Sequence, residues 1–531
     1  MYFDWKKFKE LWIFLLLLVL IIIRYPAIYY SLPDGSVFGH TRTYFQDEDA
    51  VVADTVKIIQ AAIRNPFGIL DPGQTIYPLG GRLLSFLPLS YFYLTDYRHI
   101  NPAQIIAGSA QSQASFYAVL IFCGRLVSLI ASWLLAYLLW RFYKKEKINS
   151  YLAFLGCLVF SSLPAVVILS LEAKSNLILG LVLATILVVG ANWLRGGKDY
   201  LLWLSMFLVG IATGLQLNGI LGGFIILSAL LIRYQGKFWL FWKQKINWLI
   251  FIFPVLGLLI ASPNLFFHPR YIVAMLNNAG SGALRLSLLV DWRQALASFY
   301  MLGAGWLGIG LLSLTLVISI WKFKKLSSAL KLVVIWLLLY LFVFLQTELP
   351  IPRYGFPLLF PSFVLLIYWL DNIFKSANKK GKVVVGFIFV LWCFYAVFFG
   401  LAYMKLFKQH SVQLVANQYF EKIAQPGSSV GVYFNFKHYN RVPIDYSKYK
   451  LSVCRDLEDG LVSREQLVSL PDFVVTQTNS DYNCQNEIYD LSDNYVLIKN
   501  FHNNLTFVFL NFYAKEHWQN LQPTINIYKK K

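Results

Sequence analysis

Long apolar runs separated by short polar segments dominate the chain. The first run spans Leu11 to Ile23 and continues through Tyr25 to Tyr30, which gives about the 20 residues that a helix needs to cross a bilayer core. Similar runs follow at 114–140, 151–171, 175–194, 200–215, 219–232, 246–262, 296–320, 329–347, 355–370 and 383–403. The pattern predicts an α-helical polytopic membrane protein with about eleven transmembrane helices.

The runs at 200–215 and 219–232 are the shortest, and each is near or below the usual minimum for a membrane span. We expect them to form a helical hairpin. Its tip, around Gln216 to Gly219, would reach the outer side of the membrane.

Basic residues predict the orientation, because cytoplasmic loops carry an excess of Lys and Arg. Lys6, Lys7 and Lys9 precede the first run, so we expect a cytoplasmic N-terminus in the plasma (inner) membrane. Alternating the runs places 31–113, 263–295 and 404–531 outside. It also places every dense basic cluster inside: Arg141, Lys144, Lys145 and Lys147; Arg195 and Lys198; Arg233, Lys237, Lys243 and Lys245; Lys322, Lys324, Lys325 and Lys331; Lys375, Lys379, Lys380 and Lys382.

The composition fits a protein dissolved in lipid. Of the 531 residues, 57% are hydrophobic and 14% are charged, with a formal net charge of +20, whereas ordinary soluble domains carry about 25% charged residues. A nucleic-acid-binding protein would present its basic residues on one face of a polar domain. Here they lie between apolar runs, so we expect the lipid bilayer as a partner and no nucleic acid.

Residues 404–531 have the pattern of a separate domain, which follows a transmembrane domain of residues 1–403. Val412, Val415, Tyr419 and Ile423 recur at helical spacing, and the helix ends at 425–428. The following runs are rich in β-forming residues: 430–436, 473–477, 495–501, 505–513 and 525–528. We therefore predict a small extracytoplasmic α/β or α+β domain.

Two of the five cysteines, Cys454 and Cys484, lie in this domain. Outside the cytoplasm they are candidates for a disulfide bond. Two free thiols are the alternative.

Three adjacent carboxylates, Asp47, Glu48 and Asp49, begin a stretch of the first external loop (31–113) that has an amphipathic helical pattern. Val52, Val56, Ile59 and Ile63 share its apolar face. One acidic residue at a helix N-terminus is explained by capping and by the helix dipole. Three acidic residues repel one another, which favours a catalytic role.

A proline-flanked arginine, Arg353, lies in the segment Pro350 to Pro357 at a predicted external mouth. A guanidinium can grip a phosphate with two parallel hydrogen bonds. Snorkelling from a helix end is the alternative, but the prolines fix the backbone as a positioned ligand requires.

Arg270 is a second phosphate-binding candidate. Glu172 and Lys174, at another outer turn, are weaker candidates for substrate binding, and an ordinary interfacial charge pair is favoured there.

Carboxylates and a cation at the outer surface suggest glycosyl transfer from a lipid phosphate. Phosphate leaves as a stable anion, so a single carboxylate that acts as general base on the acceptor hydroxyl suffices, with an arginine stabilising the departing group. A glycoside hydrolase instead needs two carboxylates that face each other across the bond. Asp47 is the favoured base, Glu48 would position the acceptor or the loop, and Asp49 is the alternative base.

The motifs resemble those of the GT-C superfamily of polyprenyl-phosphate-sugar-dependent glycosyltransferases, in particular the protein O-mannosyltransferase and lipid A aminoarabinose transferase branch. The matching elements are Asp47–Glu48, Arg353–Tyr354 with Pro357, Tyr77–Pro78–Leu79 and Gly124–Arg125–Leu126. The resemblance implies an inverting enzyme that moves one sugar from a polyprenyl-phosphate donor to an extracytoplasmic protein, lipid or polysaccharide. It implies no metal or other cofactor, although Asp47 and Asp49 leave a divalent cation open. Tyr354 and Tyr77 become candidates for donor and substrate binding.

The sequence departs from the family at the outer tip of the fifth span, where many relatives carry a Thr-Lys-Tyr-like element. Here the stretch is Gly214 to Asn218, without a lysine. Gln216 and Asn218 could replace that lysine only as neutral donors. The Trp-Trp-Asp-Tyr-Gly signature of oligosaccharyltransferases is also absent, which argues against en bloc transfer to asparagine.

Two other classes of function remain as alternatives. A transporter or flippase usually carries ionisable residues near the bilayer midplane and internal repeats, whereas the charges here lie at the ends of the runs. A scaffold that presents its outer domain would leave the acidic triplet without a role.

Overall fold

The structure is a computed structural model of the chain. It describes residues 18–19, 22–29, 32, 55, 58, 110–235, 237, 239–243, 245–268, 270–273, 292–303, 305–346, 352–407, 411–433, 442, 444, 448–453, 470–477, 494–502 and 524–531. These residues form a mostly helical, polytopic membrane fold and a small sheet.

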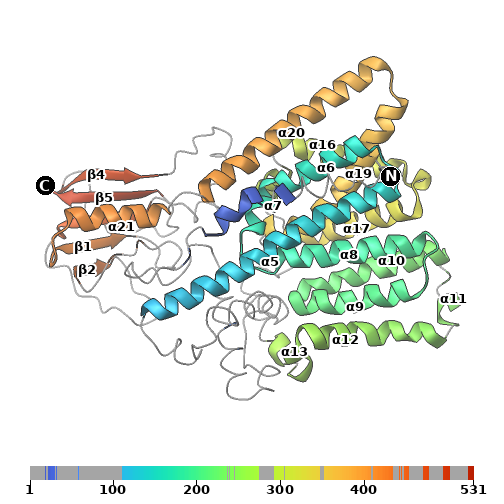
Figure 1. The fold of residues 1–531 in the computed structure, drawn as a ribbon, viewed down its shortest axis with the longest axis horizontal. Helices are drawn as coiled ribbons and strands as arrows, with labels where there is room; N and C mark the ends of the chain where they lie inside the picture. Colours follow the sequence, from blue (N-terminus) through green and yellow to red (C-terminus); the bar gives the residue numbers. More distant parts are fainter. Residues whose placement is uncertain are drawn as a thin grey trace, which may run out of the picture. The chain divides into compact units, whose positions relative to one another are not determined.

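The main helices follow the predicted apolar runs (Figure 1), except that the run 296–320, predicted as one span, is divided into the two helices α15 and α16. They are α5 (Ala110–Lys145), α6 (Ser150–Ser162), α7 (Pro164–Ser170), α8 (Asn176–Leu194), α9 (Tyr200–Leu215), α10 (Gly222–Tyr234), α12 (Ile252–Ala261), α15 (Trp292–Gly303), α16 (Trp306–Trp321), α17 (Ser328–Leu345), α19 (Leu359–Ser376) and α20 (Lys379–Phe407). Shorter elements join them: η1 (Tyr25–Tyr29), η3 (Leu217–Leu221), α11 (Trp239–Trp242), η4 (Lys245–Phe251), α13 (Pro263–Phe267), η5 (Phe323–Lys325), α18 (Pro352–Gly355) and η6 (Phe356–Leu358).

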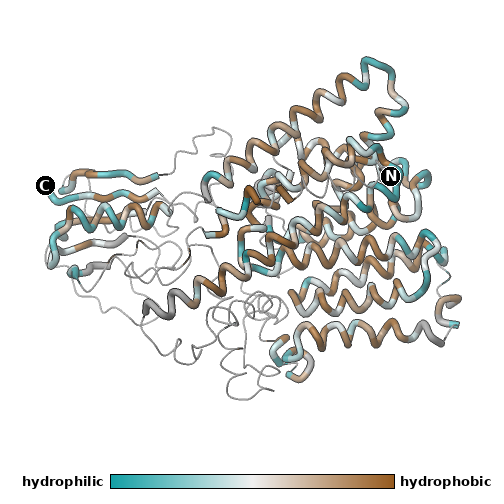
Figure 2. The backbone as a smooth tube through the Cα atoms, viewed as in Figure 1, coloured by the Kyte–Doolittle hydropathy of each residue, from teal (hydrophilic) through white to brown (hydrophobic). Residues whose placement is uncertain are grey.

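Six of the described helices are long and apolar enough to cross a membrane, or seven if α6 and α7 count as one bent span. The total of eleven therefore stays a prediction. Large apolar side chains cover the outside of these helices, as on α20, where Phe387 is 63% and Phe394 is 73% exposed. Such surfaces are unfavourable in water and suit a lipid environment. Figure 2 shows hydrophobic residues along the helices and hydrophilic residues in the loops that join them.

The predicted run 151–171 is a broken span. It bends by 60° between α6 and α7, with Leu163 at the break and Pro164 as the first residue of α7. Proline has no backbone N–H and cannot continue the hydrogen-bond ladder of the preceding helix. Carbonyl groups at the end of α6 therefore need partners from elsewhere.

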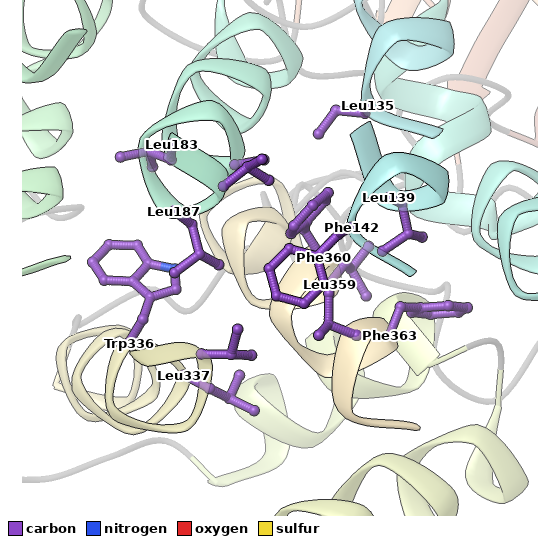
Figure 3. Close-up of a cluster of buried hydrophobic side chains, with 14 of the residues drawn as sticks. Leu135, Leu139, Phe142, Leu183, Leu187, Trp336, Leu337, Leu359, Phe360 and Phe363 are labelled. Carbon is purple, nitrogen blue, oxygen red and sulfur yellow. The ribbon is translucent and has the colours of Figure 1, made fainter. Parts of the chain in front are cut away.

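The core of the helical part lies where α5, α8, α17 and α19 meet (Figure 3). Its side chains are almost entirely aliphatic or aromatic, and they interlock across the four helices. Labelled members are Leu135, Leu139, Phe142, Leu183, Leu187, Trp336, Leu337, Leu359, Phe360 and Phe363.

Polar contacts join several predicted cytoplasmic loops at one end of these helices, here called the Arg195 end. Arg195 pairs with Glu146, which also accepts a hydrogen bond from Ser327 at 3.3 Å. Asp371 accepts from the backbone N–H of Asn149 at 3.3 Å. Basic clusters that are far apart in the sequence therefore meet at this end, as the predicted topology requires. The opposite end, where α8 begins, is called the Asn176 end.

The C-terminal residues form a five-stranded mixed sheet of order β2-β1-β3-β5-β4. Its strands are β1 (Ser429–Tyr433), β2 (Lys450–Val453), β3 (Phe473–Gln477), β4 (Tyr495–Phe501) and β5 (Ile525–Lys530). β1 is parallel to both neighbours, whereas β5 is antiparallel to β3 and β4. The strand β2 was not predicted, and the predicted strand 505–513 lies outside the described residues. The domain boundary at residue 403 and the extracytoplasmic location stay predictions.

The helix α21 (Val412–Ile423) packs against this sheet with a face that overlaps the predicted one, because Val412 is buried and Tyr419 and Ile423 pack against the same core. Phe420 is buried and contacts the rings of Tyr449 and Phe473, with centroids 5.2 and 5.5 Å apart. Val415, predicted to be on the apolar face, is 40% exposed. Apolar residues at helical spacing can form two overlapping faces on one helix. The face of α21 that packs against the sheet is the one that includes the large ring of Phe420.

Candidate functional site

Arg353 lies in α18, a single helical turn at the Asn176 end. The Tyr340 hydroxyl of α17 donates a hydrogen bond to the carbonyl of Tyr354 at 3.0 Å. On the other side, the ring of Phe356 lies directly against Gly180 of α8. The half-buried Arg353 guanidinium lies 5.3 Å from the centre of the Tyr354 ring. The backbone around Arg353 is thus held by two spans.

Gln216 joins two spans at the same end. Its backbone is extended between α9 and η3, with φ −154° and ψ 144°. Its amide nitrogen donates to Ser175 Oγ at 2.9 Å and to Asn176 Oδ1 at 2.7 Å. Both N–H groups therefore serve the protein. This differs from the expected role of Gln216 as a neutral donor to substrate, because its amide nitrogen has no further hydrogen to donate.

Asn218 lies two residues further on in η3, with its side chain against the Tyr340 hydroxyl. Its Oδ1 is buried and has no hydrogen-bond partner in the described part of the chain. Asn218 and Arg353 are therefore connected through Tyr340 and the Tyr354 carbonyl. Asn218 thus offers an acceptor as well as the predicted donor.

Glu172 and Lys174 form an ion pair in the turn between α7 and α8. Their side chains are 7% and 9% exposed, and Lys174 Nζ lies 3.4 Å from Glu172 Oε2. Ser128 of α5 donates to the Glu172 carbonyl at 2.7 Å. The two side chains thus form the charge pair that was the favoured interpretation, and the pair is buried close to Ser175, which accepts from Gln216.

Arg270 follows α13 and is exposed, with its guanidinium 5.4 Å from the centre of the Tyr271 ring. Tyr271 packs with Leu265 against Leu217 of η3. Arg270 thus lies near the Gln216 segment, on the surface rather than in the packed cluster.

The structure therefore brings together seven predicted residues at the Asn176 end. They are Glu172, Lys174, Gln216, Asn218, Arg270, Arg353 and Tyr354. Other predicted residues lie outside the described part of the chain: Asp47, Glu48, Asp49, Tyr77, Cys454 and Cys484. Thr55 and Ile58, from the stretch after the acidic triplet, are helical and buried.

Two buried arginines attach the first apolar run to other spans. Arg125 of α5, part of the predicted Arg-Leu element, is fully buried and donates to the Ile28 carbonyl at 2.7 Å. Arg24 was not predicted as a functional residue. It is 3% exposed, donates to the Ser161 carbonyl, and has its Nη1 3.5 Å from Ser170 Oγ. Its only sequence signal is its charge, between Ile23 and Tyr25.

Among the described residues, no group of three His, Cys, Asp or Glu side chains could hold a metal ion. The acidic triplet is not among those residues, so metal independence stays a prediction.

Comparison with known proteins gives a fold. No family model and no curated protein matches the sequence. A solved structure of ArnT from Cupriavidus metallidurans, bound to undecaprenyl phosphate, matches with a TM-score of 0.50 over 97% of each chain, at 10% identity. The chain has the fold of ArnT.

ArnT is a lipid A aminoarabinose transferase of the GT-C class, so the predicted resemblance is confirmed at the level of the fold. Apo ArnT aligns with a TM-score of 0.47 at 12% identity over 96% of this chain and 97% of ArnT. The mycobacterial arabinofuranosyltransferase AftD aligns with a TM-score of 0.36 at 11% identity, over 93% of this chain and 40% of AftD.

Proposed function

We propose that this protein is a membrane glycosyltransferase that uses a polyprenyl-phosphate-linked sugar. The observation that carries the proposal is the fold, which the chain shares over 97% of its length with ArnT, a protein solved with undecaprenyl phosphate bound. A donor with a polyprenyl tail is dissolved in the bilayer, and this accounts for an enzyme built mainly of apolar helices. The acceptor would be an extracytoplasmic protein, lipid or polysaccharide.

The Asn176 end supports this proposal because it combines a positioned cation with uncharged polar groups. Arg353 is half-buried and its neighbouring backbone is fixed by Tyr340 and Gly180. A guanidinium in a partly desolvated position can hold a phosphate with two charge-assisted hydrogen bonds. The uncharged polar groups are Asn218, against the Tyr340 hydroxyl, and Gln216, against Ser175 and Asn176.

In the proposed reaction, the acceptor oxygen attacks the anomeric carbon from the face opposite the phosphate. The Asp47 carboxylate takes the acceptor proton as the new carbon–oxygen bond forms. The bond between the sugar and the phosphate oxygen breaks, and polyprenyl phosphate leaves with its charge stabilised by Arg353. Attack from the opposite face inverts the anomeric centre. Glu48 would position the acceptor or the loop, and neither a general acid nor a metal ion is needed.

The purified protein should transfer sugar from at least one member of a panel of polyprenyl-phosphate sugars. We expect Asp47→Asn to lower the rate by about 10²–10⁴-fold, since this is the usual contribution of a general base. Asp34→Asn, which removes a carboxylate elsewhere in the same loop, is the matched control and should leave the rate unchanged. Near-normal turnover in Asp47→Asn would exclude Asp47 as the base. No transfer from any donor by the wild type would count against the whole proposal.

A further inference from the structure

Arg24 is a buried cation without an opposite charge among the residues that contact it. Its side chain donates to the Ser161 carbonyl, and Nη1 lies 3.5 Å from the Ser170 hydroxyl. Within the described part of the chain it forms no ion pair, and its buried Nε has no hydrogen-bond partner. A charged group at membrane depth is expensive unless it is paired, and such residues usually mark functional sites. The environment of Arg24 is therefore incomplete without an anion.

Support for the α6–α7 bend does not by itself account for this residue. The Ser161 carbonyl lies at the end of α6 and needs a donor, because the helix breaks before Pro164. A neutral amide or hydroxyl would satisfy that carbonyl without the cost of burying a charge. The carbonyl and hydroxyl that Arg24 contacts also leave its positive charge uncompensated. The charge itself, rather than the hydrogen bond, is what remains to be explained.

The position of Arg24 suggests which anion it would meet. Ser170, which it approaches, is the last residue of α7, and α7 also packs against α18, the turn that carries Arg353. A seven-residue helix is only about 10 Å long. Arg24 and the turn that carries Arg353 therefore both contact one short helix at the Asn176 end, and Glu172 and Lys174 follow directly after it.

We propose that Arg24 is a second cationic ligand, with Arg353, for the phosphate of the lipid-linked donor. This inference rests on the proposed function and adds a residue to its donor site. The phosphate would provide the missing counter-charge of Arg24, and the guanidinium fork would supply paired hydrogen bonds. Because α7 contacts both Arg24 and the α18 turn, the bend that begins α7 would help to set the spacing of the two cations.

The test compares binding of undecaprenyl phosphate with that of undecaprenol, the same lipid without its phosphate, to the full-length protein in detergent. The wild type should prefer the phosphate. Arg24→Gln should lower the affinity for undecaprenyl phosphate by about tenfold or more, with undecaprenol binding unchanged. Arg24→Lys keeps the positive charge but cannot form two parallel hydrogen bonds. It should lower the affinity for undecaprenyl phosphate less than Arg24→Gln does, with undecaprenol binding unchanged.

Arg233→Gln, which removes an exposed arginine far from the proposed site, is the control. Arg233 donates to the Trp193 carbonyl at 3.1 Å and stacks on the Trp193 ring, at the Arg195 end. Its loss should destabilise the protein without changing the preference for phosphate. If Arg24 has only a structural role, Arg24→Gln should give the same result: the affinities for undecaprenyl phosphate and for undecaprenol should both fall equally or both stay unchanged.

Three outcomes separate the possibilities. A wild type that does not prefer the phosphate would overturn the proposed function and this inference together. A wild-type preference that persists in Arg24→Gln would overturn only the inference. If Arg24→Gln does not fold, Arg24→Lys decides: a selective loss on undecaprenyl phosphate supports the inference, and unchanged affinity overturns it.

Discussion

At the scale of the residue, the position of Arg353 depends on a glycine in another helix. Gly180 of α8 has no side chain, and the ring of Phe356 occupies that space. A Cβ atom at position 180 would lie 2.4 Å from Phe356 Cε1, closer than atoms can approach. Phe356 is three residues from Arg353, so the absence of a side chain at position 180 helps to determine where the α18 turn lies.

Gly180→Ala should therefore overpack this contact and lower the free energy of unfolding by about 1–3 kcal/mol. It should also weaken binding of undecaprenyl phosphate, because the α18 turn must move. Thermal unfolding and lipid binding in detergent would measure both effects. Phe356→Leu in the same chain should restore part of each loss.

Gly223→Ala in α10 is the control, since no atom lies within 4 Å of a Cβ there. It should be neutral or slightly stabilising, because alanine is the better helix former. If the effects of Gly180→Ala and Phe356→Leu on the free energy of unfolding and on lipid binding simply add in the double variant, the proposed contact between position 180 and the Phe356 ring is contradicted.

The site residues differ in how far the sequence could reveal them. Arg353 was predicted because prolines surround it, and Gln216 because it lies where many members of the family it resembles carry a lysine. Arg24 carried the same signal of a polar residue in an apolar run, but its partners are Ser161 and Ser170, 137 and 146 residues away. No local pattern specifies such contacts, so tertiary structure was needed to show that its charge is buried and uncompensated.

At the scale of the element, apolar length predicted where helices lie but not how they bend or which face packs. The expected hairpin at 200–232 is confirmed, with α9 ending at Leu215 and η3 beginning at Leu217. The 60° bend at Pro164 was not predicted, because proline is tolerated inside membrane helices. The packed face of α21 was predicted wrongly at Val415, because similar apolar residues occur on overlapping faces.

The start of β3 is joined to the start of β1 by Asp472 and Ser429. Asp472 Oδ2 accepts from both the backbone N–H and the hydroxyl of Ser429, each at 2.8 Å. These hydrogen bonds favour the carboxylate and lower the pKa of Asp472 below its ordinary value of 3.8. The stabilisation is therefore present above pH 3.8 and is lost as the pH falls through the lower pKa of the folded state.

We expect amide hydrogen exchange in β1 and β3 of the full-length protein to accelerate as acid titrates Asp472, after correction for the intrinsic pH dependence of exchange. Asp472→Asn should remove this part of the pH dependence and leave faster exchange at neutral pH. An unchanged acid response in Asp472→Asn would show that other groups control it.

At the scale of the whole molecule, the loops at the Arg195 end should all lie in the cytoplasm. A reporter fused after Gly197 or after Gln235, in the loops that follow α8 and α10, should have cytoplasmic activity. A reporter at Lys531 should be active only outside, because the predicted spans are odd in number and the N-terminus is cytoplasmic. A cytoplasmic C-terminus would contradict the combination of eleven spans and a cytoplasmic N-terminus.

The general fold could be predicted from the sequence because a membrane imposes its constraint on each span separately. Every spanning helix must be apolar over its own length, and each is therefore visible in its own residues. The convergence of the seven candidate site residues at the Asn176 end depends on how the helices pack together. That arrangement is visible only in the structure, in contacts such as Gln216 with Asn176 and Tyr340 with Tyr354.

The contacts of Glu146 have a consequence for biogenesis. Its partner Arg195 is translated 49 residues later, and its partner Ser327 is translated 181 residues later. Because a chain leaves the ribosome from its N-terminus, this carboxylate is inserted long before its second partner exists. The loops at the Arg195 end therefore become connected in two stages, and the second stage must wait until α16 has been made. A nascent chain arrested before that point would have only the first of these two contacts, the ion pair between Glu146 and Arg195, to hold its early helices together.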